Sequence, residues 1–406
     1  MSRLTLSLTS MAAGGFAIGT TEFVTMGLLP EVTGDVGVSI PRGGWLISAY
    51  ALGVVIGAPL LAVLTARLDR TRLLLALMSA FTVGNVLSAL APGFGSLVVA
   101  RFLSGLPHGA YFGIASLVAA SLADPARRGR AIAAPMFGLT VANVVGVPAS
   151  SFLGQQLGWR AAYWFVAVVG ALTVLAVRRC VPSVPAAQGA GARRELSALA
   201  RPQVWLTMAV GAIGFGGMFA VYSYIAPVLT EAAGWSSRAV PIGLALFGIG
   251  MTVGNVVGGA LVDRSVRVTL VVGFVATLTT LALFPLAVRT VWTAGAAVFA
   301  LGVVGSVTVP ALQTRLMDVA GDAASLGASL NHSALNLANA AGAFLGGVVL
   351  SAGFGWTSPA LVGAGLALIG LGLVAVSLTL ESRSRRSDRH GVHQREPSRP
   401  QTLPVG

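Results

Sequence analysis

Lysine is absent from this chain, cysteine occurs once, and only 10% of the 406 residues are charged. A soluble domain of this size carries roughly 25% charged residues, so the composition excludes an ordinary soluble protein. Cys180 cannot form an intrachain disulfide and is expected to fill apolar space. The apolar segments hold neither a nucleophile–base pair nor a cluster of metal ligands. We therefore expect no enzyme activity, no bound metal and no cofactor.

Long apolar segments dominate the sequence instead, with 55% hydrophobic residues and a mean hydropathy of +0.84. A helix needs about 20 apolar residues to cross a bilayer. Twelve segments reach that length, which predicts an all-α polytopic membrane protein with twelve transmembrane helices. They lie near residues 5–29, 43–66, 73–92, 96–121, 131–155, 161–181, 204–229, 239–262, 268–288, 291–314, 325–350 and 357–380.

The net charge of +13 comes from 26 arginines, and their positions indicate membrane topology rather than nucleic-acid binding. Only four lie in loops on one side of the predicted helices: Arg42, Arg160, Arg238 and Arg289. Arg101 lies within a helix, and the remaining arginines lie on the other side. The positive-inside rule therefore predicts cytoplasmic N- and C-termini. The lysine-free, arginine-rich composition suggests a high-GC bacterium, so the expected location of the spans is the bacterial inner membrane. The basic tail is expected near anionic lipid.

The sequence repeats at a spacing of about 195 residues. Asn143 and Asn339 occupy similar segments, and each segment leads to a Gly-Trp pair. Each half contains an even number of spans, so the repeat is parallel and the pathway is expected between the halves. We predict two pseudo-symmetric six-helix bundles, residues 1–181 and 204–380. A cytoplasmic linker at 182–203 joins them, and a disordered basic tail follows at 381–406.

Glu22 is the only acidic side chain in the middle of a predicted transmembrane helix. An ionised carboxyl group there costs on the order of 3 kcal/mol, so it must face water, meet a cation or take up a proton. Arg101 is its natural counter-charge. A nearby guanidinium favours the ionised form of Glu22, and a dry site favours the protonated form. A conformational change that alternates the two surroundings could therefore make Glu22 take up and release a proton. In a simpler alternative, Glu22 only accepts hydrogen bonds from Thr20, Thr21 or Thr25.

The fourth predicted helix places Arg101, His108 and Phe112 on one face, because their spacings are seven and four residues. His108 could relay or sense the proton, since histidine titrates near neutrality. The alternatives are a neutral packing role for His108 and a structural role for Arg101, bonded to backbone carbonyls. Glu22, Arg101 and His108 are the predicted proton-coupling residues.

The second half offers aromatic and amide side chains in place of charge, which suits an uncharged or lipophilic solute. His332, Asn336 and Asn339 share one helical face and either contact solute or bond across the two halves. The predicted cavity residues are Phe112, Phe215, Phe219, Tyr222, Tyr224, Gln313, His332 and Asn336.

Two short loops carry Asp-Arg pairs at matching ends of the halves, Asp69-Arg70 and Asp263-Arg264. An aspartate at a helix end pairs with an arginine or with a helix N-terminus. These pairs could latch a cytoplasmic gate in one conformation, or they could only set the topology.

Together these segments resemble the major facilitator superfamily, near the twelve-span drug:proton antiporters for arabinose and chloramphenicol efflux. The resemblance is carried by residues 19–27, 50–59, 101–113 and 138–148. It implies an alternating-access fold and links Arg101 to proton coupling. Gly138, Gly146 and Pro148 fall on the antiporter motif, here as Gly-Val-Pro rather than Gly-Pro. Asn143, Gly146, Pro148 and Asn339 are therefore grouped with the Asp-Arg pairs as conformational residues. Thr65 stands where the first loop motif usually has glycine.

The residues and the resemblance predict a monomeric, proton-coupled efflux permease. Its solute would be an uncharged or amphipathic small molecule such as a drug, an antibiotic or a sugar, and the proton gradient would take the place of a cofactor. A proton-coupled importer or facilitator of sugars or other metabolites has the same fold and stays open as the alternative.

Overall fold

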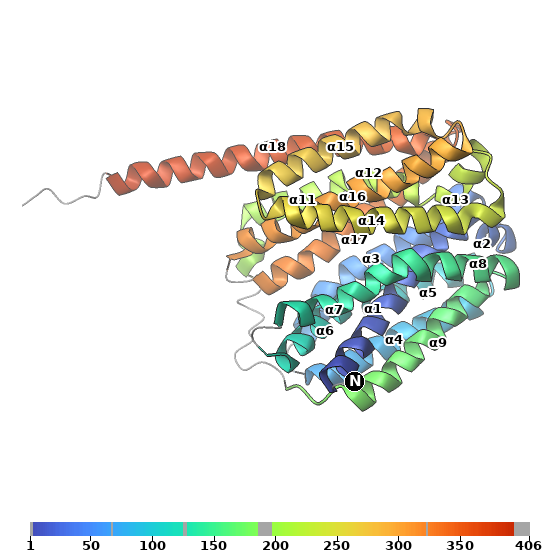
Figure 1. Ribbon diagram of the computed structural model, residues 1–406, viewed down its shortest axis with the longest axis horizontal. Helices are drawn as coiled ribbons and strands as arrows, with labels where there is room; N and C mark the ends of the chain where they lie inside the picture. The colour runs from blue at the N-terminus through green and yellow to red at the C-terminus, as the bar shows by residue number, and fades with distance from the viewer. Residues whose placement is uncertain (1–2, 66–67, 125–127, 186–196, 322–323, 394–406) are drawn as a thin grey trace, which may run out of the picture.

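The computed structural model describes the chain except residues 1–2, 66–67, 125–127, 186–196, 322–323 and 394–406 (Figure 1). Its described residues form helices and no β-strand. Eleven helices are long and apolar enough to cross a membrane, and a bent pair of helices at the N-terminus provides a twelfth span. The prediction of an all-α protein with twelve spans is confirmed.

The first six spans use α1 (Arg3–Gly27) with α2 (Leu29–Asp35), α3 (Ile40–Leu64), α4 (Arg70–Leu90), α5 (Phe94–Gly105) with α6 (His108–Leu122), α7 (Arg128–Val141) with η2 (Ala142–Gly146) and α8 (Val147–Leu157), and α9 (Arg160–Cys180). The second six use η3 (Ser197–Ala200), α11 (Pro202–Gly214), α12 (Gly216–Tyr222), α13 (Ile225–Pro227), η4 (Val228–Ala232), η5 (Ser237–Ala239), α14 (Val240–Val262), α15 (Val266–Ala287), α16 (Val291–Ala320), α17 (Ala324–Ser351) and α18 (Ser358–His393).

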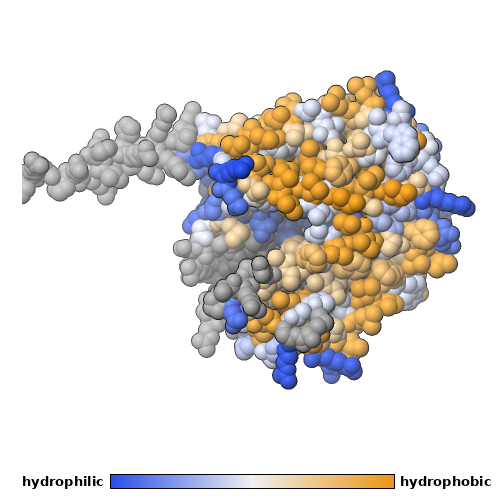
Figure 2. Space-filling view, viewed as in Figure 1, coloured by the Kyte–Doolittle hydropathy of each residue, from blue (hydrophilic) through white to orange (hydrophobic). Residues whose placement is uncertain are grey.

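The two sets of helices form two bundles that meet along the middle of the molecule (Figure 1). We call the end that holds Arg3, Cys180 and Pro202 the linker end, and the opposite end, with the α2–α3 and α8–α9 connections, the far end. The bundles converge at the far end and diverge toward the linker end. The surface between them has a recess on the linker side (Figure 2). Two seams join the bundles, α3 against α17 and α14 against η2 and α8.

Prolines stand where three of the spans are bent or broken. The axes of α1 and α2 differ by 70°, and Pro30 stands at the start of α2. Span 4 breaks at Leu106 and Pro107, because proline has no N–H to donate to the preceding turn and its ring clashes with that turn. Span 5 contains a π-helical turn just before Pro148, a feature often found at functional sites.

Glycines allow close approach of the bundles at both seams. Gly248 of α14 lies directly against the backbone carbonyl of Asn143, so a Cβ atom there would collide with it. At the other seam, the Ser48 hydroxyl donates to the Ala340 carbonyl at 3.0 Å. Small residues at such positions let helix backbones pack closely in lipid. The seams therefore seal the far end by backbone contact rather than by charge.

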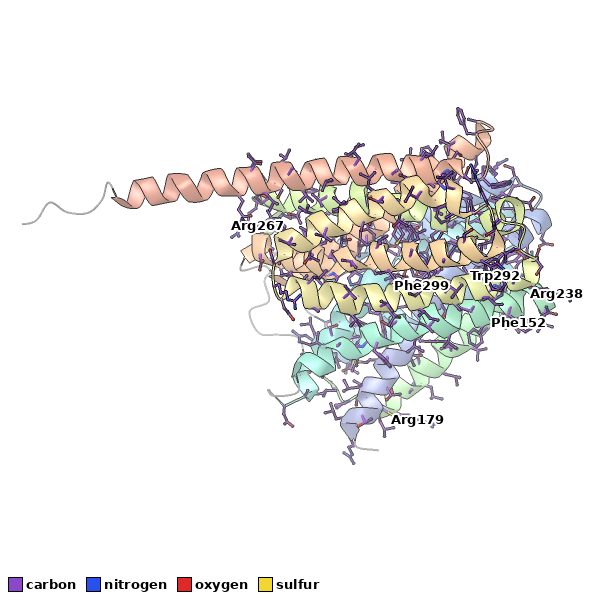
Figure 3. The ribbon with its side chains drawn as sticks, turned by 45° about the horizontal axis from the view of Figure 1, so that its top comes forward. Phe152, Arg179, Arg238, Arg267, Trp292 and Phe299 are labelled. Atoms are coloured by element: carbon purple, nitrogen blue, oxygen red, sulfur yellow. The ribbon has the colours of Figure 1, made fainter. Side chains whose placement is uncertain are left out.

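The perimeter is apolar, as a bilayer requires, and Figure 2 shows apolar side chains over much of the visible face. Trp292, at the far end of α16, is 88% exposed (Figure 3). Arg238 lies at the same end and Arg267 at the linker end (Figure 3). Exposed tryptophan and arginine at helix ends are typical of the membrane–water interface.

The C-terminal segment differs from its prediction. Residues 381–393 were expected to be disordered, yet α18 continues through them to His393. Glutamate and arginine are good helix formers, and no glycine or proline occurs between Glu381 and His390. The Glu381 carboxylate also pairs with Arg267 and Arg315, which fixes the helix where it leaves the apolar region.

We expect Gly248→Ala to destabilise this conformation, because the added methyl group meets a backbone carbonyl that cannot move aside freely. Overpacking of this kind costs about 1–3 kcal/mol. The thermal unfolding midpoint of the purified protein in detergent measures the effect. Gly259→Ala in the same helix is the matched control, since a Cβ there would meet nothing within 4 Å. Equal midpoints for the two variants would contradict close packing at this seam.

Candidate functional site

Glu22 lies in the buried stretch of α1 and is only 7% exposed. In the described part of the structure its carboxyl group has no hydrogen bond and no ion pair, and the three neighbouring hydroxyls are engaged elsewhere. Thr20 donates to the Phe16 carbonyl, Thr21 donates to Asn85, and Thr25 bonds the Tyr163 hydroxyl. The alternative in which Glu22 accepts bonds from these threonines is therefore wrong for this conformation.

Arg101 is completely buried in α5. Its Nη1 donates to the Thr21 hydroxyl at 3.2 Å and its Nη2 to the Thr21 carbonyl at 3.1 Å. The guanidinium carbon lies 4.3 Å from the centre of the Tyr50 ring and 5.6 Å from that of Tyr163. Cation–π contacts of this kind strengthen when water is excluded. The first bundle thus holds the cation through one residue of α1 and two aromatic rings.

The expected ion pair between Arg101 and Glu22 is absent from the described residues. Arg101 instead bonds Thr21, the residue before Glu22, so the charge stays close to the carboxyl group without touching it. A separated charge biases the protonation state through space and does not lock the carboxylate in place. The bond to the Thr21 carbonyl also matches the structural role left open for Arg101.

His108 is the first residue of α6, directly after the break in span 4. Its Nδ1 lies 2.9 Å from the Tyr50 hydroxyl. The same tyrosine ring lies against the guanidinium of Arg101, so Tyr50 connects the two predicted proton-coupling residues of this span. Sequence reasoning missed Tyr50, because its role depends on how α3 packs against α5 and α6.

His332 of α17 crosses from the second bundle to join this group. Its ring stacks on Phe112 at 5.7 Å with an interplanar angle of 2°, and lies 6.4 Å from the His108 ring. The sequence placed Phe112 and His332 among the cavity residues and His108 among the proton-coupling residues. The structure brings His108, Phe112 and His332 into one contact between the bundles.

A second aromatic cluster surrounds the level of Glu22. Phe23, the next residue of α1, stacks on Phe219 at 6.4 Å and meets Tyr222 edge-on at 5.7 Å. Tyr222 stacks closely on Phe247 of α14 at 3.7 Å, and Phe215 lies 6.4 Å from Phe219. Sequence reasoning missed Phe23 and Phe247, although the position of Phe23 beside the only mid-membrane acid was a usable signal.

Of the predicted cavity residues Tyr224 and Gln313, Tyr224 has another place in the structure. The Tyr224 hydroxyl donates to the Ala343 carbonyl at 2.7 Å and is buried in the seam with α17, so it seals the far end in this conformation. Gln313 is half-buried in α16 and has no hydrogen-bond partner among the residues described. Only Tyr224 is thus removed from the expected cavity wall.

Several buried amides lack partners. The Nδ2 of Asn336 donates to the His332 carbonyl at 3.1 Å, but its side-chain oxygen is unpaired. Both polar atoms of Asn339 and the side-chain oxygens of Asn143 and Asn331 are also unpaired in the described structure. Burying such a group without a partner costs roughly 1–3 kcal/mol. These amides can therefore bind water or a polar solute.

The Asp-Arg loops act within their own bundles in this conformation. Asp69 caps α4 by accepting the Arg72 backbone N–H at 2.9 Å, and it accepts the Ser183 hydroxyl at 2.7 Å. These two bonds hold the pKa of Asp69 below its usual value. The Asp263 and Arg264 side chains have no hydrogen-bond or ion-pair partner among the described residues. A latch between the bundles remains a prediction for another conformation.

An ion cluster in the second bundle was missed because the predicted helices ended at residues 314 and 380. Arg315 is 8% exposed and pairs with Glu381 at 3.1 Å, while its Nη2 donates to Ser377 at 2.8 Å. Arg267 pairs with the same carboxylate at 2.9 Å. The cluster ties α15, α16 and α18 together at the linker end.

No group of three or more histidine, cysteine or acidic side chains that could hold a metal ion occurs among the described residues. The arrangement offers one unbonded carboxyl group, one fixed cation and two aromatic clusters between the bundles. Such a set can exchange a proton and hold an uncharged molecule.

Known proteins resemble the chain over most of its length. The family model "Major Facilitator Superfamily" matches residues 11–328 and 226–403. The inner membrane transport protein YdhP of Escherichia coli K12 is 42% identical over 375 residues, covering 90% of this chain and 95% of that protein. A chloramphenicol resistance protein of Streptomyces lividans is 35% identical, with coverage of 89% and 94%.

Among solved structures, a bacterial homologue of the human lysosomal transporter Spinster superposes with a TM-score of 0.68. It was described in an inward-facing and unoccupied conformation. The alignment covers 93% of this chain and 96% of that one at 16% identity, which supports the fold alone.

We expect acid to weaken the cap that Asp69 provides. A carboxyl group whose pKa is lowered by folding stabilises the protein above its unfolded pKa of about 3.9, and this stability is lost as the pH falls through the folded value. The difference in unfolding midpoint between wild type and Asp69→Asn should therefore shrink between about pH 5 and pH 3.

Asp124→Asn is the control for the Asp69 experiment, because Asp124 is exposed and has no bonded partner in the described structure. The unfolding midpoint of Asp124→Asn should stay close to that of wild type over the whole pH range. A difference between wild type and Asp69→Asn that is constant with pH would contradict the cap.

Proposed function

The chain belongs to the major facilitator superfamily, and on that premise we propose that it is a proton-coupled efflux permease for uncharged or amphipathic small molecules. Its partners would be the solute, protons and the bilayer, and it would act as a monomer in a bacterial inner membrane. The observation that carries the proposal is the buried, unbonded carboxyl group of Glu22 between a fixed cation and an aromatic cluster from the second bundle.

The coupling follows from the surroundings of Glu22. Its carboxyl group is close enough to Arg101, Tyr50 and Tyr222 to interact with them electrostatically. In a dry site the neutral acid is favoured, and when water enters the nearby guanidinium favours the carboxylate. Opening and closing the space around Glu22 would therefore take up and release one proton per cycle.

The conformation supports alternating access. If the arginine-rich linker end is cytoplasmic, as the positive-inside rule requires, the recess on the linker side faces the cytoplasm and the joined far end faces the outside (Figure 2). The far-end seams of α3 with α17 and of α14 with α8 would then separate in the outward-facing state. The hydrogen bond from Ser48 to the Ala340 carbonyl would break in that separation.

The side chains between the bundles favour a neutral solute with some polar groups. Phe23, Phe219 and Tyr222 supply apolar ring faces, and the unpaired amides of Asn336 and Asn339 supply hydrogen-bonding atoms. The relative named for chloramphenicol resistance supports export of such a molecule. Moving one charge across 100 mV yields about 2.3 kcal/mol, which corresponds to roughly a 50-fold concentration ratio.

We expect Glu22→Gln to abolish proton-driven transport while leaving the fold intact, because the amide matches the protonated acid in shape and cannot titrate. Proteoliposomes with an imposed pH gradient and labelled chloramphenicol or arabinose provide the assay. The gradient-driven flux should fall at least tenfold, that is, by about 1.4 kcal/mol or more in barrier.

Glu31→Gln serves as the matched control for Glu22→Gln, since Glu31 is another α1–α2 carboxylate but lies at the far end. Its flux should stay near the wild-type value. Normal gradient-driven exchange by Glu22→Gln would exclude the proposed role of Glu22. Accumulation on the cytoplasmic side along with protons would instead indicate an importer.

A further inference from the structure

A second hollow lies outside the pathway, at the far end of the seam between α3 and α17. It has a volume of about 420 Å³, within the range of about 300–1,000 Å³ typical of ligand pockets. Residues from the first turns of α3 and the last turns of α17 line it, among them Arg42, Trp45, Ser48, Phe344, Val348 and Ser351. Tyr224 fills the seam behind it and separates it from the central aromatic cluster.

Glycines of both helices line the hollow, Gly44 of α3 and Gly347 of α17. The Tyr224 hydroxyl lies where a Cβ atom on either glycine would stand, so both positions need glycine for the seam to close behind the hollow. Trp45 and Phe344 contact each other edge to face, with ring centres 5.6 Å apart. The result is a groove with a small-residue floor and aromatic walls.

The groove opens to the perimeter rather than to the pathway. Trp45, Phe344 and Val348 are 48%, 45% and 47% exposed, although all belong to membrane-spanning helices. Large apolar side chains on the outer surface of a spanning helix face lipid. An acyl chain is therefore the apolar partner available to these walls.

One positive charge stands at the mouth of the groove. Arg42 is the third residue of α3, at the level where spanning helices meet water, and its side chain is exposed. Its guanidinium lies 5.3 Å from the centre of the Phe94 ring and has no hydrogen bond or ion pair among the described residues. Asp35, the last residue of the preceding helix α2, pairs with Arg160 instead. Arginine matches the geometry of a phosphate group through two parallel hydrogen bonds.

We propose that this groove binds an anionic phospholipid of the leaflet at the far end. The phosphate would lie on Arg42, with the exposed hydroxyls of Ser39 and Ser351 near the headgroup. The upper part of one acyl chain would lie along the exposed faces of Trp45 and Phe344. Since α3 and α17 belong to different bundles, the bound lipid bridges the closed seam and stabilises the conformation in which the far end is shut.

Native mass spectrometry of the delipidated protein, titrated with phosphatidylglycerol or phosphatidylethanolamine, tests the site. Wild type should retain one phosphatidylglycerol more tightly than phosphatidylethanolamine. Arg42→Gln should weaken that binding at least threefold, and excess inorganic phosphate should not displace it. The matched control is Arg238→Gln, an arginine at the same end but on another helix (Figure 3), which should bind as wild type does.

Location is tested separately with a phosphatidylglycerol that carries a photoactivatable group in its acyl chain. Cross-links should concentrate in residues 40–48 and 343–351. Equal binding by Arg42→Gln and wild type, equal loss in both arginine variants, or cross-links confined to other helices would each overturn the proposal. Because these experiments measure no transport, their outcome is independent of the role of Glu22.

Discussion

A carboxyl group in the middle of a bilayer must be neutral, hydrated or paired, and that constraint shapes the centre of this protein. Glu22 is not paired in the conformation described here, since Arg101 bonds the preceding threonine instead. An ion pair with Arg101 would have held Glu22 in its ionised state and so prevented proton exchange. Because Arg101 bonds the residue before Glu22, the carboxyl group can be either protonated or ionised. Hydration then decides between the two forms.

The two bundles place different kinds of side chain around Glu22. Among the described residues, the hydrogen bonds and cation–π contacts of Arg101 come from the first bundle, through Thr21, Tyr50 and Tyr163. Its distance from Glu22 is therefore independent of how the bundles move. The second bundle approaches Glu22 with neutral aromatic side chains such as Tyr222. Movement of that bundle would therefore change the water around the acid without changing the fixed charge beside it.

The sequence predicts much of the fold and less of the site, for physical reasons. Apolar length and arginine distribution reveal twelve spans, because lipid imposes both patterns on any chain. Helix packing sets how each helix is rotated and how deep it lies in the membrane, and a sequence does not show this. The contact of His108 with His332 and the partners of Arg101 depend on both. The buried pair of Arg315 with Glu381 was missed for a related reason, since a paired charge lets a helix stay regular beyond the apolar segment.

Infrared difference spectroscopy of the purified protein tests the central claim most directly, because a protonated carboxyl group has a carbonyl stretch separate from that of a carboxylate. The spectrum should show such a band that disappears as the pH rises, and the Glu22→Gln protein should lack it. A titrating band of equal size in both proteins, or none in wild type, would show that this carboxyl group does not exchange a proton.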